Sequence, residues 1–320
     1  MRRCLITGCG GFIGSHLAER LLKEAWSVYG TVRRRPSSLD RMDGRLTVIE
    51  CDILDALSVE QAVREAEPDV VFHLAAQSSP SASWRQPEPT FRVNVFGTLY
   101  LLQAMLAVCP DATLVAVTSS AVYGASDRGD TPIKEHSPLR PSSPYGVSKA
   151  AADMLAELFW RTYGLRVIRA RPFFISGPRK LGDVCSDFCR GVVETENQQR
   201  PSLAVGNLEA VRDFLHVRDA VEALLLLAEK GQPGEAYNIC SGTGTSVSDL
   251  LQAVIAAAGV PAEVYRDPEL DRPLDDPITV GDRSLLSALG WQPKTTIREM
   301  VRDTLEFWRQ EAVHATQGAV

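Results

Sequence analysis

The sequence predicts an α/β fold, in which a doubly wound parallel sheet is joined to a smaller, discontinuous C-terminal lobe. Three observations support this prediction. The chain opens on an apolar run that ends among glycines and leads directly into an amphipathic helical pattern, RRCLITGCGGFIGSHLAERLLKEA. Strand-like and helix-like segments then alternate, as they do where helices connect parallel strands. The strand-like segments are continuous apolar runs, which is typical of strands covered on both faces.

The first of these features is a glycine turn at residues 8–14. Gly8, Gly11 and Gly14 have the spacing GxxGxxG between the apolar run and the helix. Glycines let the backbone turn sharply, approach a pyrophosphate closely and pack helix on strand. Unpaired N–H groups and the positive end of the helix dipole then face the phosphates. The order strand, turn, helix therefore favours a dinucleotide site over a Gly-rich turn without a ligand.

The remaining segments follow in the order that such a sheet requires. Beyond residue 172 the alternation becomes irregular, and the tail 314–320 is expected to be disordered. We predict a dinucleotide-binding domain over residues 1–171, to which 213–240 return, and a smaller lobe over 172–212 and 241–320. The expected strands are 27–32, 45–53, 69–76, 112–120, 164–172 and 236–241; the expected helices are 57–67, 90–108, about 145–163 and 217–231; a Ser- and Pro-rich loop is expected at 78–89.

Composition and charge exclude several classes of protein. The 320 residues are 45% hydrophobic, which is enough for a sizeable core, and the formal net charge of −6 argues against general nucleic-acid binding. We expect no signal peptide and no apolar run near the ~18 residues of a membrane span, and therefore a cytoplasmic protein. The seven cysteines are scattered and are expected to be buried thiols. Cys185 and Cys189 lie one helical turn apart without a second pair nearby, so no metal site is predicted.

A second motif, YGVSK, places Tyr145 and Lys149 four residues apart at the start of a helix, and thus on one face. A Lys ammonium beside a phenol lowers the pKa of the Tyr, which can then exchange a proton with a hydroxyl or carbonyl. Ser119, in VTSSAVYG, ends the preceding strand, at the edge where open α/β sheets bind ligands. The alternative for Ser119 is an ordinary cluster of serines at a strand end.

The end of the second strand bears on the choice of cofactor. NAD sites usually carry an acidic residue there, whereas this chain reads GTVRRRPSS. Arg33 and Arg34 can pair with a 2′-phosphate through charge-assisted hydrogen bonds. The sequence therefore favours NADP(H), with NAD(H) as the alternative; a solvated basic loop is the other interpretation of the arginines.

The motifs TGCGGFIG, HLAA, NVFGT, SSAVYG and YGVSK, in this order, resemble the extended short-chain dehydrogenase/reductase superfamily, also called the NAD-dependent epimerase/dehydratase family. This resemblance covers nearly the whole chain and implies a Rossmann domain with a nucleotide-sugar lobe. The stretches VGNLEAVRDFLHVRDAVEA, YNICSGTGTSV and LGWQPKTTIREMVRDTLEFW are similar to one branch, the GDP-mannose 4,6-dehydratases and GDP-4-keto-6-deoxymannose reductases. The segment QSSPSASWRQPEPTFRVNVFGTL is closer to the reductases.

The resemblance also implies roles for individual residues. Tyr145 would be the acid/base, Lys149 would hold the nicotinamide ribose, Ser119 would orient the substrate oxygen and Arg212 would bind the nucleotide diphosphate. For Arg212 the alternative is a surface charge. The implied cofactor contacts are Gly8, Gly11, Phe12, Ile13, Gly14, Arg33, Arg34, Asp52, Ile53, Leu74, Ala75, Ala76 and Lys149. The implied substrate contacts are Ser78, Asn94, Ser120, Phe174, Val205 and Arg212.

Two departures from this branch narrow the expected reaction. Ala121 stands where the dehydratases have a Glu for water elimination, and a methyl group cannot replace that carboxyl group. Phe174 and Ile175 stand where the branch usually has Asn and His, which leaves the identity of the sugar, and that of the nucleotide, open. The expectation is NADPH-dependent reduction of a 4-keto nucleotide sugar of the GDP-4-keto-6-deoxymannose type. The alternatives are a nucleotide-sugar C4 epimerase with tightly bound NAD(P), and a non-catalytic dinucleotide-sensing protein.

The two long helices expected at 90–108 and 145–163 are apolar over much of their surface. Helices of this kind are buried against another partner. In the family they pair across a two-fold axis, so the resemblance implies a homodimer formed through a four-helix bundle.

Overall fold

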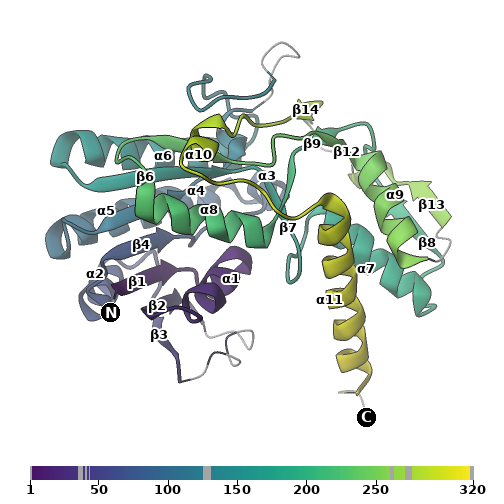
Figure 1. The fold of residues 1–320 in the computed structure, drawn as a ribbon, viewed down its shortest axis with the longest axis horizontal. Coiled ribbons are helices and arrows are strands. Elements are labelled where there is room, and N and C mark those ends of the chain that lie inside the picture. Colours follow the sequence, from purple (N-terminus) through teal and green to yellow (C-terminus); the bar gives the residue numbers. More distant parts are fainter. Residues whose placement is uncertain are drawn as a thin grey trace.

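The computed structural model describes residues 2–34, 39, 42, 44–124, 131–259, 263–270 and 276–317. Its centre is a seven-stranded sheet in which all neighbouring strands are parallel (Figure 1). The strand order β11-β6-β5-β4-β1-β2-β3 contains the Rossmann order and confirms the predicted fold class. The strands are β1 (Arg2–Thr7), β2 (Trp26–Val32), β3 (Leu46–Glu50), β4 (Val70–His73), β5 (Thr113–Val117), β6 (Arg166–Pro172) and β11 (Ala236–Ile239).

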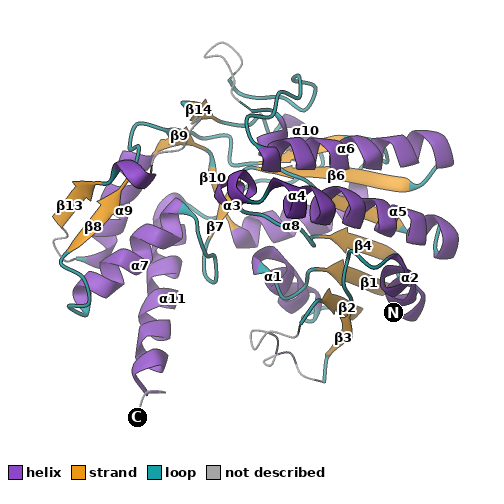
Figure 2. Ribbon diagram, turned by 180° about the vertical axis from the view of Figure 1, so that it is seen from behind, coloured by secondary structure: helices purple, strands orange, loops and turns teal. Residues whose placement is uncertain are grey.

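Helices cover both faces of this sheet (Figures 1 and 2). Side chains alternate along each strand, so Cys4 and Ile6 of β1 belong to one core cluster and Leu5 belongs to the other. The first cluster includes residues of α1 (Phe12–Leu21) and α8 (Val217–Lys230). The second includes residues of α2 (Ala56–Ala66), α5 (Gly97–Val108) and α6 (Pro144–Tyr163). The apolar strand runs are therefore explained by burial on both faces.

The segment 78–89, expected to be a loop, instead forms two short helices, α3 (Pro80–Arg85) and most of α4 (Pro87–Phe91). The Ser79 hydroxyl caps α3 by accepting a hydrogen bond from the Ala82 N–H. Each helix has a proline in its first turn, where the missing N–H costs no hydrogen bond. The prediction of a loop is wrong because serine and proline, which are frequent in loops, cap and begin helices here.

The chain continues without interruption from α4 through a π-helical turn, η2 (Arg92–Phe96), into α5. Over an 18-residue window of this 22-residue helical run the mean hydropathy is 1.4, so its length and composition would allow it to cross a membrane. The expectation that no apolar run approaches that length is therefore wrong. A helix in the core of a soluble protein meets the same criteria, and α5 packs against α2 and α6.

A separate hydrophobic cluster lies in the second lobe, where α7 (Val184–Glu196), α9 (Val247–Ala258) and α11 (Ile297–Gln317) pack together (Figure 1). The division into lobes with the predicted bounds stays a prediction, because Leu286 and Trp291 of the range 241–320 belong to the core cluster of the sheet. Residues 314–317, expected to be disordered, are helical, and 318–320 lie outside the described residues. The other elements are β7 (Phe174–Ser176), β8 (Ser202–Val205), β9 (Val211–Arg212), β10 (Phe214–His216), β12 (Thr245–Ser246), β13 (Glu263–Arg266), β14 (Ile278–Thr279), α10 (Ser284–Ala288) and the 3-10 turns η3 (Ser120–Val122) and η4 (Pro268–Leu270).

Candidate active site

The glycine turn lies where β1 and β4 are adjacent and the strand order reverses, which is where open α/β sheets bind ligands. Gly8 has φ +70°, and a Cβ on it would lie 2.8 Å from the Cα of Ala75. A Cβ on Gly14 would lie 2.4 Å from the carbonyl oxygen of Gly8. No larger residue fits either position, and no side-chain hydrogen bond caps α1 at Gly11. Because the turn carries no side chains at these positions, a pyrophosphate could approach the backbone N–H groups at the positive end of α1.

Several other predicted cofactor residues surround this turn. The Thr7 hydroxyl oxygen accepts hydrogen bonds from the N–H groups of Leu74 and Ala75, both 3.1 Å long, and so joins the ends of β1 and β4. Half-buried side chains at the start of α1 and after β4 adjoin the turn; they are Phe12, Ile13, Leu74, Ala75 and Ala76.

The remaining cofactor residues lie toward β2 and β3. Arg33 and Arg34 are exposed directly after β2. The N–H of Cys51 donates to the Val32 carbonyl. The next residue on each strand, Arg33 after β2 and Asp52 after β3, therefore lies at the same end of this pair of strands. The Asp52 carboxylate accepts from the Leu54 N–H, and a Cβ on Gly97 would lie 2.7 Å from the side chain of Ile53.

The predicted catalytic residues come from β5 and α6. Ser143 and Pro144 begin α6, with the Ser143 hydroxyl accepting from the Gly146 N–H, and this start places Tyr145 and Lys149 in the first two turns. Both side chains are buried. The Lys149 ammonium donates to the carbonyl of Val117, the last residue of β5, over 3.1 Å. Lys149 is thus held at the ligand-binding edge of the sheet, because Val117 lies two residues before Ser119.

The charge state of Tyr145 differs from the expectation. Burial raises the pKa of the Tyr145 phenol, and a hydrogen bond with the Ser119 hydroxyl opposes this rise only in part. Burial also lowers the pKa of Lys149 to about 8. The prediction that Lys149 lowers the pKa of Tyr145 is therefore wrong for the protein chain by itself, because desolvation dominates. The phenol of Tyr145 therefore keeps its proton at neutral pH.

Residues that the sequence did not single out hold the backbone of Tyr145. The Ser83 hydroxyl accepts from the Tyr145 N–H over 3.1 Å, and the Ser148 hydroxyl donates to the Tyr145 carbonyl over 2.7 Å. Ser148 also accepts from the amide of Asn94. Ser148 lies inside the motif YGVSK, so its support of Tyr145 could have been predicted from the sequence. Ser83 lies in the segment predicted to be a loop, which gave no such indication.

Asn94 was expected to contact substrate, and its side chain has other partners in the structure. It is only 1% exposed, and its amide bonds to the backbone N–H and carbonyl of Gln77 and to Ser148. These hydrogen bonds hold protein groups around the site in place. Contact between Asn94 and the substrate stays a prediction.

A buried ionic cluster lies one helical turn beyond Lys149. Asp153 accepts hydrogen bonds from Arg169 and Arg171 of β6, at 2.7–2.9 Å, and from the Thr118 hydroxyl. Burial alone would raise the pKa of Asp153, but the hydrogen bonds and charges of Arg171 and Arg169 outweigh it, and the pKa lies below its usual value. Two features of the sequence indicate this cluster: Asp153 follows Lys149 by four residues, and the arginines of RAR alternate along β6.

The predicted substrate residues do not form one contact network. The Arg212 guanidinium lies 5.3 Å from the centre of the Phe174 ring, and Phe174 in turn contacts Phe214. Arg212 is only 5% exposed, so it is not a surface charge. Buried Val205 belongs to the lobe cluster against which Phe174 packs. Ser78 follows β4 and is exposed, whereas Ser120 follows β5 and is buried. Both belong to the domain that contains the parallel sheet.

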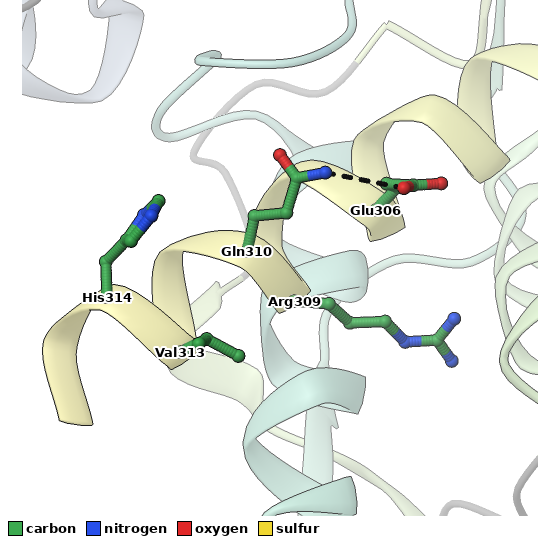
Figure 3. A pocket seen from close by; sticks show the side chains of 5 residues that line it. All are labelled: Glu306, Arg309, Gln310, Val313 and His314. Carbon is green, nitrogen blue, oxygen red and sulfur yellow. Dashed lines mark hydrogen bonds between the residues drawn. The ribbon is translucent and has the colours of Figure 1, made fainter. Parts of the chain in front are cut away.

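Two hollows lie away from all of these residues. One, of about 580 Å³, is lined by α11 residues, among them Arg309 and His314 (Figure 3). The other, of about 540 Å³, lies between α1 and α8 and includes Trp26 and Trp291. Within the described ranges no group of three His, Cys, Asp or Glu could hold a metal, and Cys185 and Cys189 are buried free thiols. The candidate site is therefore the carboxyl edge of β1, β4 and β5 with the start of α6.

Known proteins are similar to this chain in sequence and in fold. The profile of the GDP-mannose 4,6 dehydratase family matches residues 5–304. The chain is 33% identical to the GDP-6-deoxy-D-mannose reductase of Pseudomonas aeruginosa over 310 residues, which is 96% of this chain and 97% of the reductase. The P. aeruginosa RMD structure complexed with NADPH is similar at a TM-score of 0.85, with 31% identity, covering 97% of this chain and 99% of that one. The UDP-glucose 4-epimerase of Thermus thermophilus in complex with NAD is similar at 0.88, with 32% identity and the same coverage.

These relatives are NAD(P)-dependent enzymes of nucleotide-sugar chemistry, and their cofactors agree with a site that favours NADP(H) and has NAD(H) as the alternative. A phosphate-binding glycine turn and a Ser–Tyr–Lys set are residue patterns that such chemistry can use, and the roles of Ser119, Tyr145 and Lys149 stay a prediction. The chain therefore belongs to the GDP-mannose 4,6 dehydratase family, within the NAD(P)-dependent short-chain dehydrogenases/reductases that act on nucleotide sugars.

Proposed function

We propose that this protein catalyses the NADPH-dependent reduction of a 4-keto nucleotide sugar of the GDP-4-keto-6-deoxymannose type. The observation that carries the proposal is the arrangement of Tyr145 and Lys149, both buried in the first two turns of α6, with Ser119 hydrogen-bonded to the Tyr145 phenol at the end of β5. Ala121 supplies only a backbone N–H to the Ser119 hydroxyl, and its methyl group cannot carry the acid/base step of water elimination. Similarity to a GDP-6-deoxy-D-mannose reductase supports the nucleotide and the sugar.

In this reaction NADPH, when bound, supplies the hydride that the carbonyl carbon accepts. Tyr145 gives its phenolic proton to the carbonyl oxygen, and Ser119 donates a hydrogen bond to the same oxygen. Lys149, fixed on the Val117 carbonyl one helical turn after Tyr145, would place a positive charge on the side of α6 where the phenolate forms. The glycine turn would hold the pyrophosphate, and Arg33 with Arg34 would pair with the 2′-phosphate. Arg212, stacked on Phe174, would bind the diphosphate of the sugar nucleotide.

The substrate class is tested by incubating the protein with NADPH and a set of GDP- and UDP-4-keto sugars, with the product read by NMR. We expect reduction of a GDP-linked sugar with one NADPH oxidised per product, and a lower rate with NADH. A C4-inverted product without net oxidation of cofactor would favour the epimerase alternative, which the similarity to UDP-glucose 4-epimerases supports. Binding of NADPH without turnover of any sugar would favour the dinucleotide-sensing alternative.

Turnover should depend on the charge of Lys149. Because burial lowers the pKa of Lys149 to about 8, its ammonium is present below that pH and is lost as the pH rises through it. Tyr145, whose pKa is raised, stays protonated over the same interval. We expect kcat to fall between about pH 7 and about pH 9. A flat profile over this interval would contradict the role of Lys149, and Lys149→Arg, which cannot lose its charge there, is the matched control.

We also propose that two copies pair through α5 and α6. Exposed apolar side chains lie on α6 and on the π-helical turn η2 that leads into α5, with Phe96 48%, Met154 57% and Leu158 51% exposed. Only 39% of the apolar window in the run Pro87–Val108 is buried within one chain. Exposed apolar side chains that gather on one part of a surface are typical of an interface. Light scattering at micromolar concentration should give the mass of a dimer, which Met154→Glu with Leu158→Glu should halve; a wild-type monomer would refute the pairing. A cytoplasmic location stays a prediction.

A further inference from the structure

A buried histidine that the proposed reaction does not use lies at the end of β4. His73 is held between two hydroxyl groups, with Nδ1 2.8 Å from Oγ1 of Thr7 and Nε2 2.9 Å from Oγ1 of Thr98. All three side chains are buried. Thr7 directly precedes Gly8 of the glycine turn, and Thr98 lies in the first turn of α5. The imidazole therefore joins the cofactor strand to a helix on one face of the sheet.

The direction of each hydrogen bond follows from its neighbours. The Thr98 hydroxyl donates its proton to the Asn94 carbonyl over 2.7 Å, so toward His73 it acts as an acceptor. Nε2 of His73 must then carry a proton. Oγ1 of Thr7 already accepts from the N–H groups of Leu74 and Ala75, so its own proton goes to Nδ1. The neutral Nε2–H form of His73 satisfies every one of these groups.

The same series of bonds continues to the catalytic helix. The Asn94 amide donates to the Ser148 hydroxyl over 2.9 Å, and Ser148 donates to the carbonyl of Tyr145. Asn94 lies within the π-helical turn η2, and such turns are frequent at functional sites. We call the buried chain Thr7–His73–Thr98–Asn94–Ser148–Tyr145 the Thr7–Tyr145 series. It joins the residue before the glycine turn to the residue proposed as proton donor.

A positive charge on His73 would disrupt this series. A cationic imidazole has two donors, and Nδ1–H would meet a Thr7 oxygen that already accepts two hydrogen bonds. It would also repel the nearby Lys149 ammonium. Burial first, and then Lys149, accordingly lower the pKa of His73 to about 3.

We propose that His73 is a positioning residue which, as a permanently neutral Nε2–H imidazole, couples the glycine turn to α6 and so sets the geometry between the cofactor and Tyr145. The effect on catalysis rests on the proposed function, whereas the tautomer does not. Fixing two reacting groups in one frame matters because small misplacements strongly reduce the rate of a transfer between them.

The tautomer is tested on the wild-type protein by ¹⁵N NMR of the imidazole nitrogens, with His73→Gln used to assign the signal. We expect a single Nε2–H signal pattern for His73 that does not change between about pH 5 and about pH 8. An Nδ1–H pattern, or a change of charge in this interval, would overturn the proposal. This measurement decides the matter even if the protein reduces none of the sugars offered.

The coupling is tested by Thr98→Val, which removes the acceptor for His73, with Thr304→Val as the matched control. Thr304 is also buried, and its hydroxyl also donates to the carbonyl four residues earlier, over 2.7 Å, but it lies in α11. We expect Thr98→Val to lower kcat about tenfold or more, with KM for NADPH little changed. Thr304→Val should leave kcat unchanged, and Thr98→Ser should restore it.

Equal kcat values in Thr98→Val and Thr304→Val would show that the hydroxyl of Thr98 serves only to stabilise a helix, and the proposal would fall. If Thr98→Val does not fold, Thr98→Ser still retains the acceptor, and the wild-type tautomer remains the deciding measurement.

Discussion

Replacing Tyr145 by phenylalanine should lower kcat for sugar reduction by about 10²–10⁴-fold, because the phenolic proton has no substitute in the transition state. The fold should survive this change. The hydrogen bonds of Ser83 and Ser148 to residue 145 involve its backbone, and the phenyl ring fills the same buried space. The measurement is single-turnover oxidation of NADPH with the sugar that the wild type reduces. The affinity for NADPH, measured by quenching of its fluorescence, should change little.

Tyr123→Phe is the matched control for this variant. Tyr123 is also buried, and its hydroxyl also makes hydrogen bonds, to Asn238 and Arg171, but it packs in the cluster around Phe173. Its loss should cost stability and leave turnover within a few-fold of wild type. If Tyr145→Phe also remained within a few-fold, the proposed proton donor would be wrong, and the reductase mechanism with it.

Asp153→Ala should destabilise the protein by about 3–5 kcal/mol, because it leaves the buried Arg171 without its counter-charge, while Arg169 keeps only the half-exposed Glu157. Asp153 is 0% exposed and binds both Arg169 and Arg171. After its removal the Arg171 guanidinium would retain hydrogen bonds to the Tyr123 hydroxyl and the Glu135 carbonyl, and neither group carries a negative charge. Urea denaturation followed by tryptophan fluorescence measures the loss.

Glu157→Ala provides the comparison for Asp153. Glu157 also pairs with Arg169, over 2.7 Å, but its side chain is 35% exposed, so its removal should cost at most about 1 kcal/mol.

The stabilisation that Asp153 contributes should depend on pH in a defined direction. Its pKa is depressed in the folded state, so the contribution is present above the unfolded pKa and is lost as the pH falls through the folded value. Equal destabilisation by the two variants would show that burial of the cluster contributes little.

The glycine turn and the Tyr–Lys pair could be predicted from the sequence because each depends on local spacing. Gly8 and Gly14 are required by contacts within the turn or with the adjacent β4, and Tyr145 and Lys149 share a face because helices repeat every 3.6 residues. The parallel sheet followed from alternation and apolar strands. These features need no knowledge of what lies far away in the chain.

The features that the sequence did not reveal depend on distant contacts. Ser83 reaches the backbone of Tyr145 from 62 residues away, and it does so because prolines began helices in a segment interpreted as loop. The direction of the Tyr145 pKa shift depends on burial, which the spacing to Lys149 does not report. Asn94 carries the kind of side chain that binds a sugar, and only its burial shows that its amide has protein partners.

The position of β11 beside β6 has a consequence for biosynthesis. β11 belongs to the sheet, yet the ribosome makes it only after β7, α7 and β8 of the other lobe. Until then β6 is an open edge strand. Its residue Arg169 also lacks two partners, the Glu235 carbonyl for its backbone N–H and the Gly234 carbonyl for its guanidinium. The nascent first domain is therefore exposed to aberrant strand pairing while the second lobe is being synthesised, and a gene cut after residue 171 would not yield two independently folding halves.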